Sequence, residues 1–228
     1  MKIVRLSILS VLFLTAIACT NAANAISSER NDLWDIVSHC LDSSGSLHCE
    51  DCPSPIEGSA CACLKTTEVW EKSDDYVAIR DRKMCGCPGG FVHGLALPRK
   101  QITGAEDKDR PIGIWRFAWK VAAKRIAAPE VALLVNGKTC RSQDQLHVHI
   151  VKLNSEGHNF KGKNAAEVAN LDEVWSTAEE LANKAQIKYF SVLVKLGERG
   201  FVVVVDDSCL EERYTEYACE INITPILN

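Results

Sequence analysis

Two histidines separated by one apolar residue are the clearest candidates for chemistry in this 228-residue chain. His147 and His149 lie in the segment Arg141-Ser-Gln-Asp-Gln-Leu-His-Val-His-Ile150, in which polar and apolar residues alternate from Gln145 onward. Successive side chains of a β-strand point to opposite faces of the sheet. The alternation therefore predicts a strand whose two imidazoles share one polar space, above an apolar back formed by Leu146, Val148 and Ile150.

Such a histidine pair suits the cleavage of a phosphoanhydride. A neutral imidazole nitrogen can attack phosphorus, and the covalent intermediate divides one difficult displacement into two easier ones. The second histidine could then hydrogen-bond the phosphate oxygens on which charge accumulates. Neither role requires a metal ion.

The same pair has two other interpretations. His147 and His149 could be metal ligands, in which case zinc would need a third ligand from His93, His158 or a carboxylate. They could also be two surface histidines without a chemical role.

The segments around the pair predict an α+β fold with a mainly antiparallel sheet and flanking helices. The apolar run Val131–Val135 and the strand Leu146–Leu153 could form a hairpin across the polar loop between them. Hydrophobic periodicity and turn residues place the other elements. We expect helices at 29–40, 109–128 and Ala165–Lys188, and strands at Tyr76–Arg80, Phe91–Leu97, Phe190–Leu196 and Phe201–Val205.

Residues 1–25 are typical of a signal peptide. They combine a basic start, an apolar stretch from Ile8 to Ala18, and the small-residue site Ala23-Asn-Ala25. An uncleaved membrane anchor and a lipoprotein modified at Cys19 are the alternatives. We expect the protein to be exported, and residues 26–228 to form a single domain.

The cysteines support export. The chain has eleven cysteines, and ten of them follow Cys19. Because ten is an even number, several disulfides are expected in an oxidising compartment. The segment 40–87 is rich in cysteine, and we predict a disulfide-rich N-terminal region with Cys40–Cys49 as one pairing. Zinc bound by thiolates is the alternative for Cys49, Cys52, Cys61, Cys63, Cys85 and Cys87.

The charge balance argues against a nucleic-acid partner, because 26 basic residues face 30 acidic ones. Within this balance, Arg99-Lys100, Lys120, Lys124-Arg125 and Arg141 could form a cationic rim for a diphosphate. Solvated surface charges are the other interpretation, except for Arg141, which lies beside the histidines. At helical spacing, Trp115 and Trp119 are predicted to be core residues.

The motifs together resemble the histidine-triad nucleotide hydrolases and transferases, and within them the bacterial CDP-diacylglycerol pyrophosphatases. The resemblance extends over most of the chain after residue 25. It is carried by Asn136-Gly137, Arg141-Ser-Gln-Asp144 before the histidine strand, Trp115-x3-Trp119, Leu95-Ala-Leu-Pro98, Ile102-x-Gly104 and Cys219-Glu-Ile221.

The resemblance implies a role for each candidate residue and a fold like that of the histidine-triad proteins. His147 occupies the middle triad position and would be the nucleophile that takes up CMP, while His149 would assist at the phosphate. Asn136 and Ser142 would bind ribose or phosphate. Arg141, His93 and Gln145 complete the candidates for substrate binding. Gln145 stands where the family usually has the first histidine, so a reduced rate is expected.

The activity that the resemblance implies is hydrolysis of CDP-diacylglycerol to CMP and phosphatidate, without a metal or other cofactor. The expected partners are this lipid or a related nucleotide diphosphate, a membrane surface and, because triad proteins are often dimeric, a second copy of the chain. The protein would be periplasmic or attached to the inner membrane. Two alternatives stay open: a binding protein weakened as an enzyme by Gln145, and a hydrolase of a soluble nucleotide diphosphate.

Overall fold

The computed structural model describes residues 30–40, 68–84, 87–160 and 162–219. The expected signal peptide, residues 1–25, lies outside the described residues. The same holds for the expected Cys40–Cys49 disulfide, because the side chains of both cysteines lie outside the described part. Among the described residues, no helix is long and apolar enough to cross a membrane.

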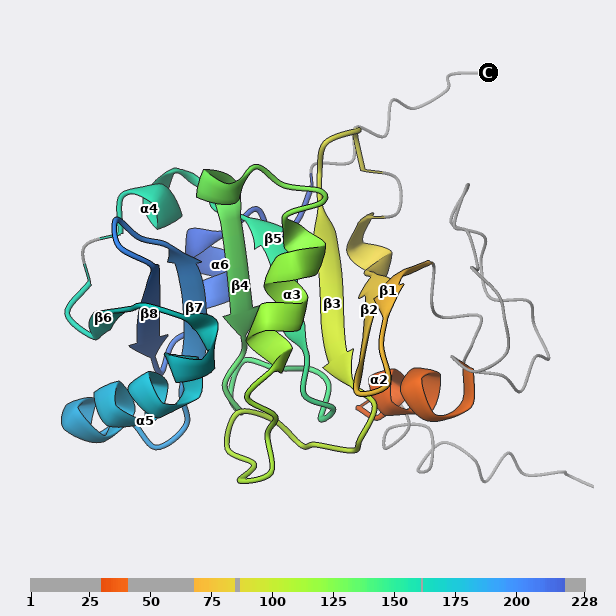
Figure 1. Ribbon diagram of the computed structural model, residues 1–228, viewed down its shortest axis with the longest axis horizontal. Coiled ribbons are helices and arrows are strands. Elements are labelled where there is room, and N and C mark those ends of the chain that lie inside the picture. The colour runs from red at the N-terminus through yellow and green to blue at the C-terminus, as the bar shows by residue number, and fades with distance from the viewer. Residues whose placement is uncertain (1–29, 41–67, 85–86, 161, 220–228) are drawn as a thin grey trace, which may run out of the picture.

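One antiparallel sheet of eight strands forms the centre of the protein, in the order β1-β2-β3-β5-β4-β7-β8-β6. Figure 1 shows β4 and β5 in the middle of this sheet. The strands are β1 Val69–Lys72, β2 Tyr76–Arg80, β3 His93–Pro98, β4 Val131–Val135, β5 Val148–Lys152, β6 Ala165–Val168, β7 Ser191–Leu196 and β8 Phe201–Asp206.

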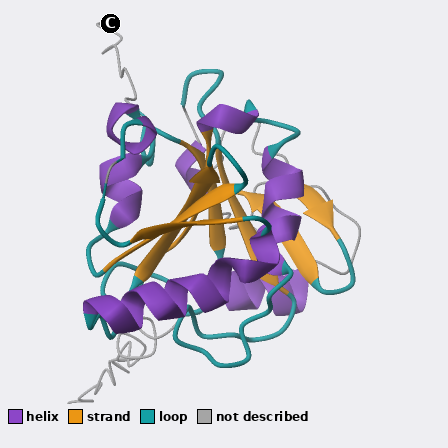
Figure 2. Cartoon of the chain, turned by 60° about the vertical axis from the view of Figure 1, so that its left-hand side comes forward, coloured by secondary structure: helices purple, strands orange, loops and turns teal. Residues whose placement is uncertain are grey.

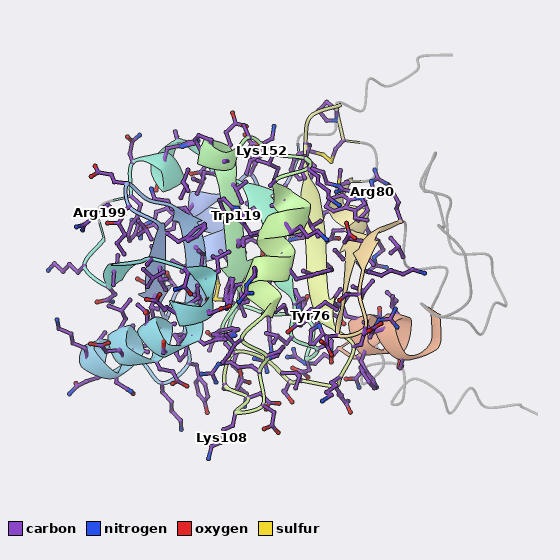
Figure 3. The ribbon with its side chains drawn as sticks, in the orientation of Figure 1. Tyr76, Arg80, Lys108, Trp119, Lys152 and Arg199 are labelled. Carbon is purple, nitrogen blue, oxygen red and sulfur yellow. A yellow bond between two sulfur atoms is a disulfide. The ribbon has the colours of Figure 1, made fainter. Side chains whose placement is uncertain are left out.

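Two helices, α3 Ile114–Ala122 and α5 Val174–Ala185, pack on one face of the sheet, which we call the apolar face. Figures 1 and 2 show both helices on the same side of the strands. Trp115 of α3 is fully buried and meets Trp175 of α5 edge to face, with ring centroids 4.9 Å apart. Figure 3 labels Trp119, the second tryptophan of α3, which packs on Phe201. Both tryptophans that were predicted to be core residues therefore pack against aromatic partners.

The opposite face of the sheet, which we call the site face, carries shorter helices. These are α2 Asp32–Asp35, which continues into a π-helical turn at Ile36–Cys40, α4 Ser155–His158, and α6 Leu210–Tyr214. Leu33 and Ile36 pack on Leu95 and neighbouring strand residues. At the other end, Leu210 packs on Leu134 and Leu193. The two apolar contacts leave the middle of this face to polar side chains.

Most predicted elements are present, with shifted ends. Val131–Val135 has the predicted bounds, and it pairs with β5 as expected. The predicted strand at Phe91–Leu97 begins at His93, and the helix predicted at 109–128 is limited to Ile114–Ala122. The strand β1 and the helices α4 and α6 were not predicted, because each is short and takes its stability from neighbours more than from its own pattern.

The predicted helix Ala165–Lys188 is wrong in its first part. Residues Ala165–Val168 form β6, which pairs with β8 at the edge of the sheet. Asn170 then caps a 3₁₀ turn by accepting a hydrogen bond from the backbone of Asp172, and α5 follows. Alanine and glutamate favour helix weakly per residue, so the backbone hydrogen bonds and burial that β8 offers outweigh that preference.

The disulfides also correct a prediction, because those in the described residues are not specifically N-terminal. Cys87 pairs with Cys219, and Cys140 pairs with Cys209. Both bonds attach the C-terminal segment 209–219 to loops on the site face. Cys87 therefore cannot serve as a zinc thiolate. The pairing reflects which loops the sheet brings together, which cysteine spacing does not encode.

Candidate active site

A cavity of about 470 Å³ opens on the site face, between α2 and α6. Its volume falls in the usual range for small-molecule sites. Its floor includes Ile79, Leu95 and His149 from three neighbouring strands. The other lining residues come from α2, the turn after β2, the loop before β5 and the C-terminal segment: Asp32, Leu33, Ile36, Arg80, Asp81, Arg82, Lys83, Asn136, Cys140, Arg141, Ser142, Gln143, His147, Glu211, Glu212 and Tyr217.

His147 lines this cavity and immediately precedes β5. Its Nδ1 lies 2.7 Å from the backbone carbonyl oxygen of Gln145. A carbonyl oxygen can only accept, so Nδ1 carries the proton and donates it. Burial lowers the pKa of His147, partly offset by this hydrogen bond. The ring is therefore neutral near pH 7, with the lone pair on Nε2.

His149 lies within β5, and its ring centroid is 4.7 Å from that of His147. Its backbone pairs with Leu95 on one side and Leu134 on the other, which fixes the face to which it points. Burial lowers the pKa of His149 well below its ordinary value, against the opposing effect of Glu211. Val148 and Ile150 point into the core on the apolar face, so the predicted alternation holds along β5.

His93, the first residue of β3, is fully buried behind His149. Its Nε2 lies 3.0 Å from Nδ1 of His149. Burial lowers the pKa of His93, and Asp81 opposes the shift. This candidate does not line the cavity, but it contacts a histidine that does.

Asn136 follows β4 and lines the cavity. Its Nδ2 lies 3.3 Å from Nε2 of His149 and donates to a carboxylate oxygen of Glu211 at 2.7 Å. The next residue, Gly137, passes so close to Phe190 that an added Cβ would lie 2.8 Å from its carbonyl carbon. The Asn136-Gly137 motif thus combines a polar group at the site with a close backbone approach.

Ser142 and Arg141 lie in the loop before β5 and both line the cavity. Ser142 is exposed, whereas the Arg141 side chain is 3% exposed. The guanidinium donates to both carboxylate oxygens of Glu106, at 2.7 and 2.6 Å. It packs so closely on Gly104 that a Cβ there would lie 2.4 Å from Nη1. Arg141 therefore joins two loops at the rim through a bidentate ion pair.

Gln145, two residues before His147, lies outside the cavity lining formed by the described residues. Its Nε2 donates to the carbonyl oxygens of Pro98 and Lys100, at 3.1 and 2.9 Å. Its Oε1 accepts from the backbone N–H of Ile102 at 3.3 Å. The side-chain amide thus attaches the loop after β3 to the start of the histidine strand.

The structure adds three residues that were not singled out in the sequence: Glu211, Lys83 and Asp81. Glu211 is 5% exposed, and its Oε1 accepts from Lys83 at 2.9 Å. Asp81 Oδ2 lies 3.5 Å from Nε2 of His93. A polar run directly after a predicted strand was a signal for Asp81 and Lys83. No spacing connects Glu211 to the histidines.

Of the expected cationic rim, Arg141 lines the cavity, whereas Lys120 and Lys124 pair with Glu71 of β1. Arg125 stacks on Trp70. These three charges belong to the surface around β1 and α3 and not to the histidine site.

The metal interpretation also has a geometric counterpart. Asp81, His93 and His149 offer ligand atoms that lie within 4.8 Å of one another. His93 is one of the residues that were expected to supply a third ligand to zinc. His158, another, is exposed on α4 and lies outside this group.

A family model described as CDP-diacylglycerol pyrophosphatase matches residues 28–195. The chain belongs to this family. Membership makes the protein a hydrolase and implies that its substrate is CDP-diacylglycerol. The matched range includes His93, Asn136, His147 and His149, whereas Glu211 lies beyond it. No curated protein matches the chain. The two disulfides fit an exported protein.

Proposed function

We propose that this CDP-diacylglycerol pyrophosphatase releases CMP and phosphatidate through a nucleotidyl-histidine intermediate on His147. The observation that carries the proposal is the hydrogen bond from Nδ1 of His147 to the carbonyl oxygen of Gln145, because it leaves the lone pair on Nε2 of a neutral ring that lines the cavity. Burial supports the same state by lowering the pKa of the ring.

In the first step, the lone pair on Nε2 of His147 forms a bond to the phosphorus attached to cytidine. The bond from this phosphorus to the bridging oxygen breaks, and phosphatidate leaves with the electron pair. Phosphatidate is a stabilised anion, so its departure needs little help from a general acid.

In the second step, a water oxygen bonds to the same phosphorus while the water gives up a proton to a neighbouring base, and the bond to Nε2 breaks with its electron pair returning to the ring. CMP is released. Asn136, Ser142 and Lys83 lie around the cavity where they could bind the ribose or the phosphates, and Lys83 supplies positive charge at the rim. Arg141 and Gln145 hold the surrounding loops in place.

The size of the cavity favours a head group as the bound part of the substrate. A volume of about 470 Å³ suits a nucleotide diphosphate, whereas the acyl chains would stay in the membrane surface. A periplasmic or membrane-attached enzyme with one catalytic domain fits this arrangement. It also makes soluble nucleotide diphosphates the natural competitors in an assay.

The test uses the purified protein with CDP-diacylglycerol micelles, EDTA and ¹⁸O-labelled water. We expect CMP that carries the label, a nucleotidyl-enzyme in rapidly quenched samples, and a loss of activity of at least about 10³-fold in His147→Ala. His158→Ala, a change of the same kind on exposed α4, is the matched control.

Label in phosphatidate would mean attack at the other phosphorus and would refute the proposal. Equal activity of His147→Ala and wild type would refute it as well. Faster cleavage of soluble CDP conjugates than of the lipid would keep the mechanism but reassign the substrate.

A further inference from the structure

A buried carboxylate, that of Glu211, lies beside His149 and His93. Glu211 reaches the site from α6, where Oε1 lies 3.3 Å from Nδ1 of His149 and 3.4 Å from Nε2 of His93. Its other oxygen, Oε2, accepts the hydrogen bond from Asn136. The residue lies far along the chain from β5, and the Cys140–Cys209 disulfide holds the start of its helix.

The hydrogen bonds assign the proton positions on His149. The carboxylate of Glu211 can only accept, so the amide nitrogen of Asn136, and not its oxygen, faces it. The second N–H of that amide points to Nε2 of His149 at 3.3 Å, which makes Nε2 an acceptor. A neutral ring then carries its proton on Nδ1, which faces His93 and Glu211.

The electrostatics fit this assignment. Burial raises the pKa of Glu211, but attraction to a protonated His149 and to the Lys83 ammonium outweighs burial and holds this pKa well below its usual range. The Lys83 ammonium donates to the carboxylate at 2.9 Å. A proton that reaches Nε2 of His149 therefore produces an imidazolium whose other N–H faces a carboxylate that stays negative.

We propose that Glu211 is a positioning residue that keeps the lone pair of His149 on Nε2 and stabilises the imidazolium formed when His149 accepts a proton. The proposal rests on the proposed function, in its second step. The water oxygen bonds to phosphorus, and the water proton moves to Nε2 of His149, where it replaces the long hydrogen bond from Asn136. The bond from phosphorus to His147 breaks with its electrons returning to His147. Solvent then takes the proton from His149.

A divalent metal ion is the competing interpretation of the same cluster, since Asp81, His93 and His149 converge there. Two contacts favour the proton network. The hydrogen bond that Asn136 donates to Nε2 of His149 favours the tautomer whose Nδ1 carries the proton, and a protonated nitrogen is not a metal ligand. The ammonium of Lys83 also bonds to the carboxylate that faces both histidines.

The kinetic test compares Glu211→Gln with wild type in both steps of the reaction. We expect kcat to fall about 10²-fold with little change in KM, and the nucleotidyl-enzyme to accumulate because the second step is slowed. The acidic limb of the kcat profile should move to lower pH, because removing the carboxylate lowers the pKa of His149 further. Glu211→Asp should recover part of the rate.

Glu216→Gln is the matched control, since Glu216 is an exposed carboxylate of the same segment outside the cavity lining. An unshifted acidic limb in Glu211→Gln would overturn the proposal, and so would equal behaviour of Glu211→Gln and Glu216→Gln. A wild-type protein that releases no labelled CMP would instead be a failure of the proposed function.

A second measurement needs no turnover. ¹⁵N spectra of the wild-type imidazoles should show the proton of His149 on Nδ1 and a bare Nε2, with a changed pattern in Glu211→Gln. A proton on Nε2 at neutral pH would overturn the proposal. One equivalent of bound zinc that is lost in His93→Ala would overturn it too, in favour of the metal site.

Discussion

The two faces of the central sheet use the same strands for opposite purposes. On the apolar face, Val148 and Ile150 of β5 are fully buried among aliphatic and aromatic side chains beneath α3 and α5. On the site face, His149 of the same strand lies among histidines, an amide and a carboxylate. One residue along the strand therefore separates close packing from a polar network.

The two faces differ in their contribution to stability: the apolar face stabilises the fold, whereas the site face costs free energy. Burial of apolar area on the first face is favourable by roughly 25 cal/mol per Å². On the site face, neutral histidines and an ionised Glu211 are kept out of water, which costs free energy unless every polar atom has a partner. Variants of the apolar face should therefore change stability, and variants of the site face should change rate or pH dependence.

The largest expected effect on stability belongs to the apolar face. Trp115→Ala removes a fully buried indole that meets Trp175, and we expect unfolding in urea to become easier by about 3–5 kcal/mol. The kcat of the folded fraction should stay unchanged. Ile112→Ala, at a residue that is 57% exposed, should change stability by less than about 0.5 kcal/mol. A large loss of kcat in Trp115→Ala would break the division between the faces.

The Cys140–Cys209 disulfide should affect both properties, because it connects a cavity loop to the helix that carries Glu211. We expect Cys140→Ser with Cys209→Ser to lower stability by about 2–4 kcal/mol and to lower kcat as well. Denaturant titrations and CMP release measure the two effects. Treatment of wild type with a thiol reductant should lower both at least as much, because it also reduces Cys87–Cys219. Unchanged kcat in the double variant would separate the Cys140–Cys209 disulfide from the site.

Gln145 tests whether a residue of the histidine motif serves structure or chemistry. Gln145→Leu leaves the N–H of Ile102 and the carbonyl oxygens of Pro98 and Lys100 without their partner, so we expect a stability loss of about 1–3 kcal/mol. Gln145→His introduces the histidine that the resemblance to triad proteins leads us to expect, but it should not raise kcat, because the side chain lies outside the cavity lining. A clear gain in kcat would show that the first triad position acts on the substrate.

The last prediction concerns pH, whose effect on stability is small for a single histidine but adds over three of them. His93, His147 and His149 have pKa values lowered by burial from the ordinary 6.5, so below about pH 6.5 the unfolded chain binds protons that the folded chain excludes. This contribution to stability should therefore be complete above pH 6.5 and be lost with acidification, by at most about 1.4 kcal/mol per pH unit for each such histidine. Urea titrations between pH 7 and pH 5 measure this slope.

His93→Gln removes one of the buried titrating groups and should reduce the slope. His158→Ala should leave it unchanged, because His158 is exposed. A flat stability between pH 7 and pH 5 would contradict the view that the site face buries neutral histidines at a cost.

Much of the sheet, and the face of the sheet to which the histidines point, could be predicted from the sequence. Strand alternation is a local property. It predicted the strand Val131–Val135 and its partner strand, and it placed Val148 and His149 on opposite faces of the sheet. The resemblance to the pyrophosphatases, carried by short motifs of the same local kind, is confirmed by the family match.

The groups that complete the site are brought together by contacts between segments that are distant in the chain. Glu211 reaches His149 because segment 209–219 is fastened to two loops by disulfides, and neither pairing is encoded in cysteine spacing. Residues Ala165–Val168 form a strand because their backbone pairs with the edge of β8. In each case the deciding energy comes from a partner distant in the chain, whereas periodicity and propensity report only on neighbours.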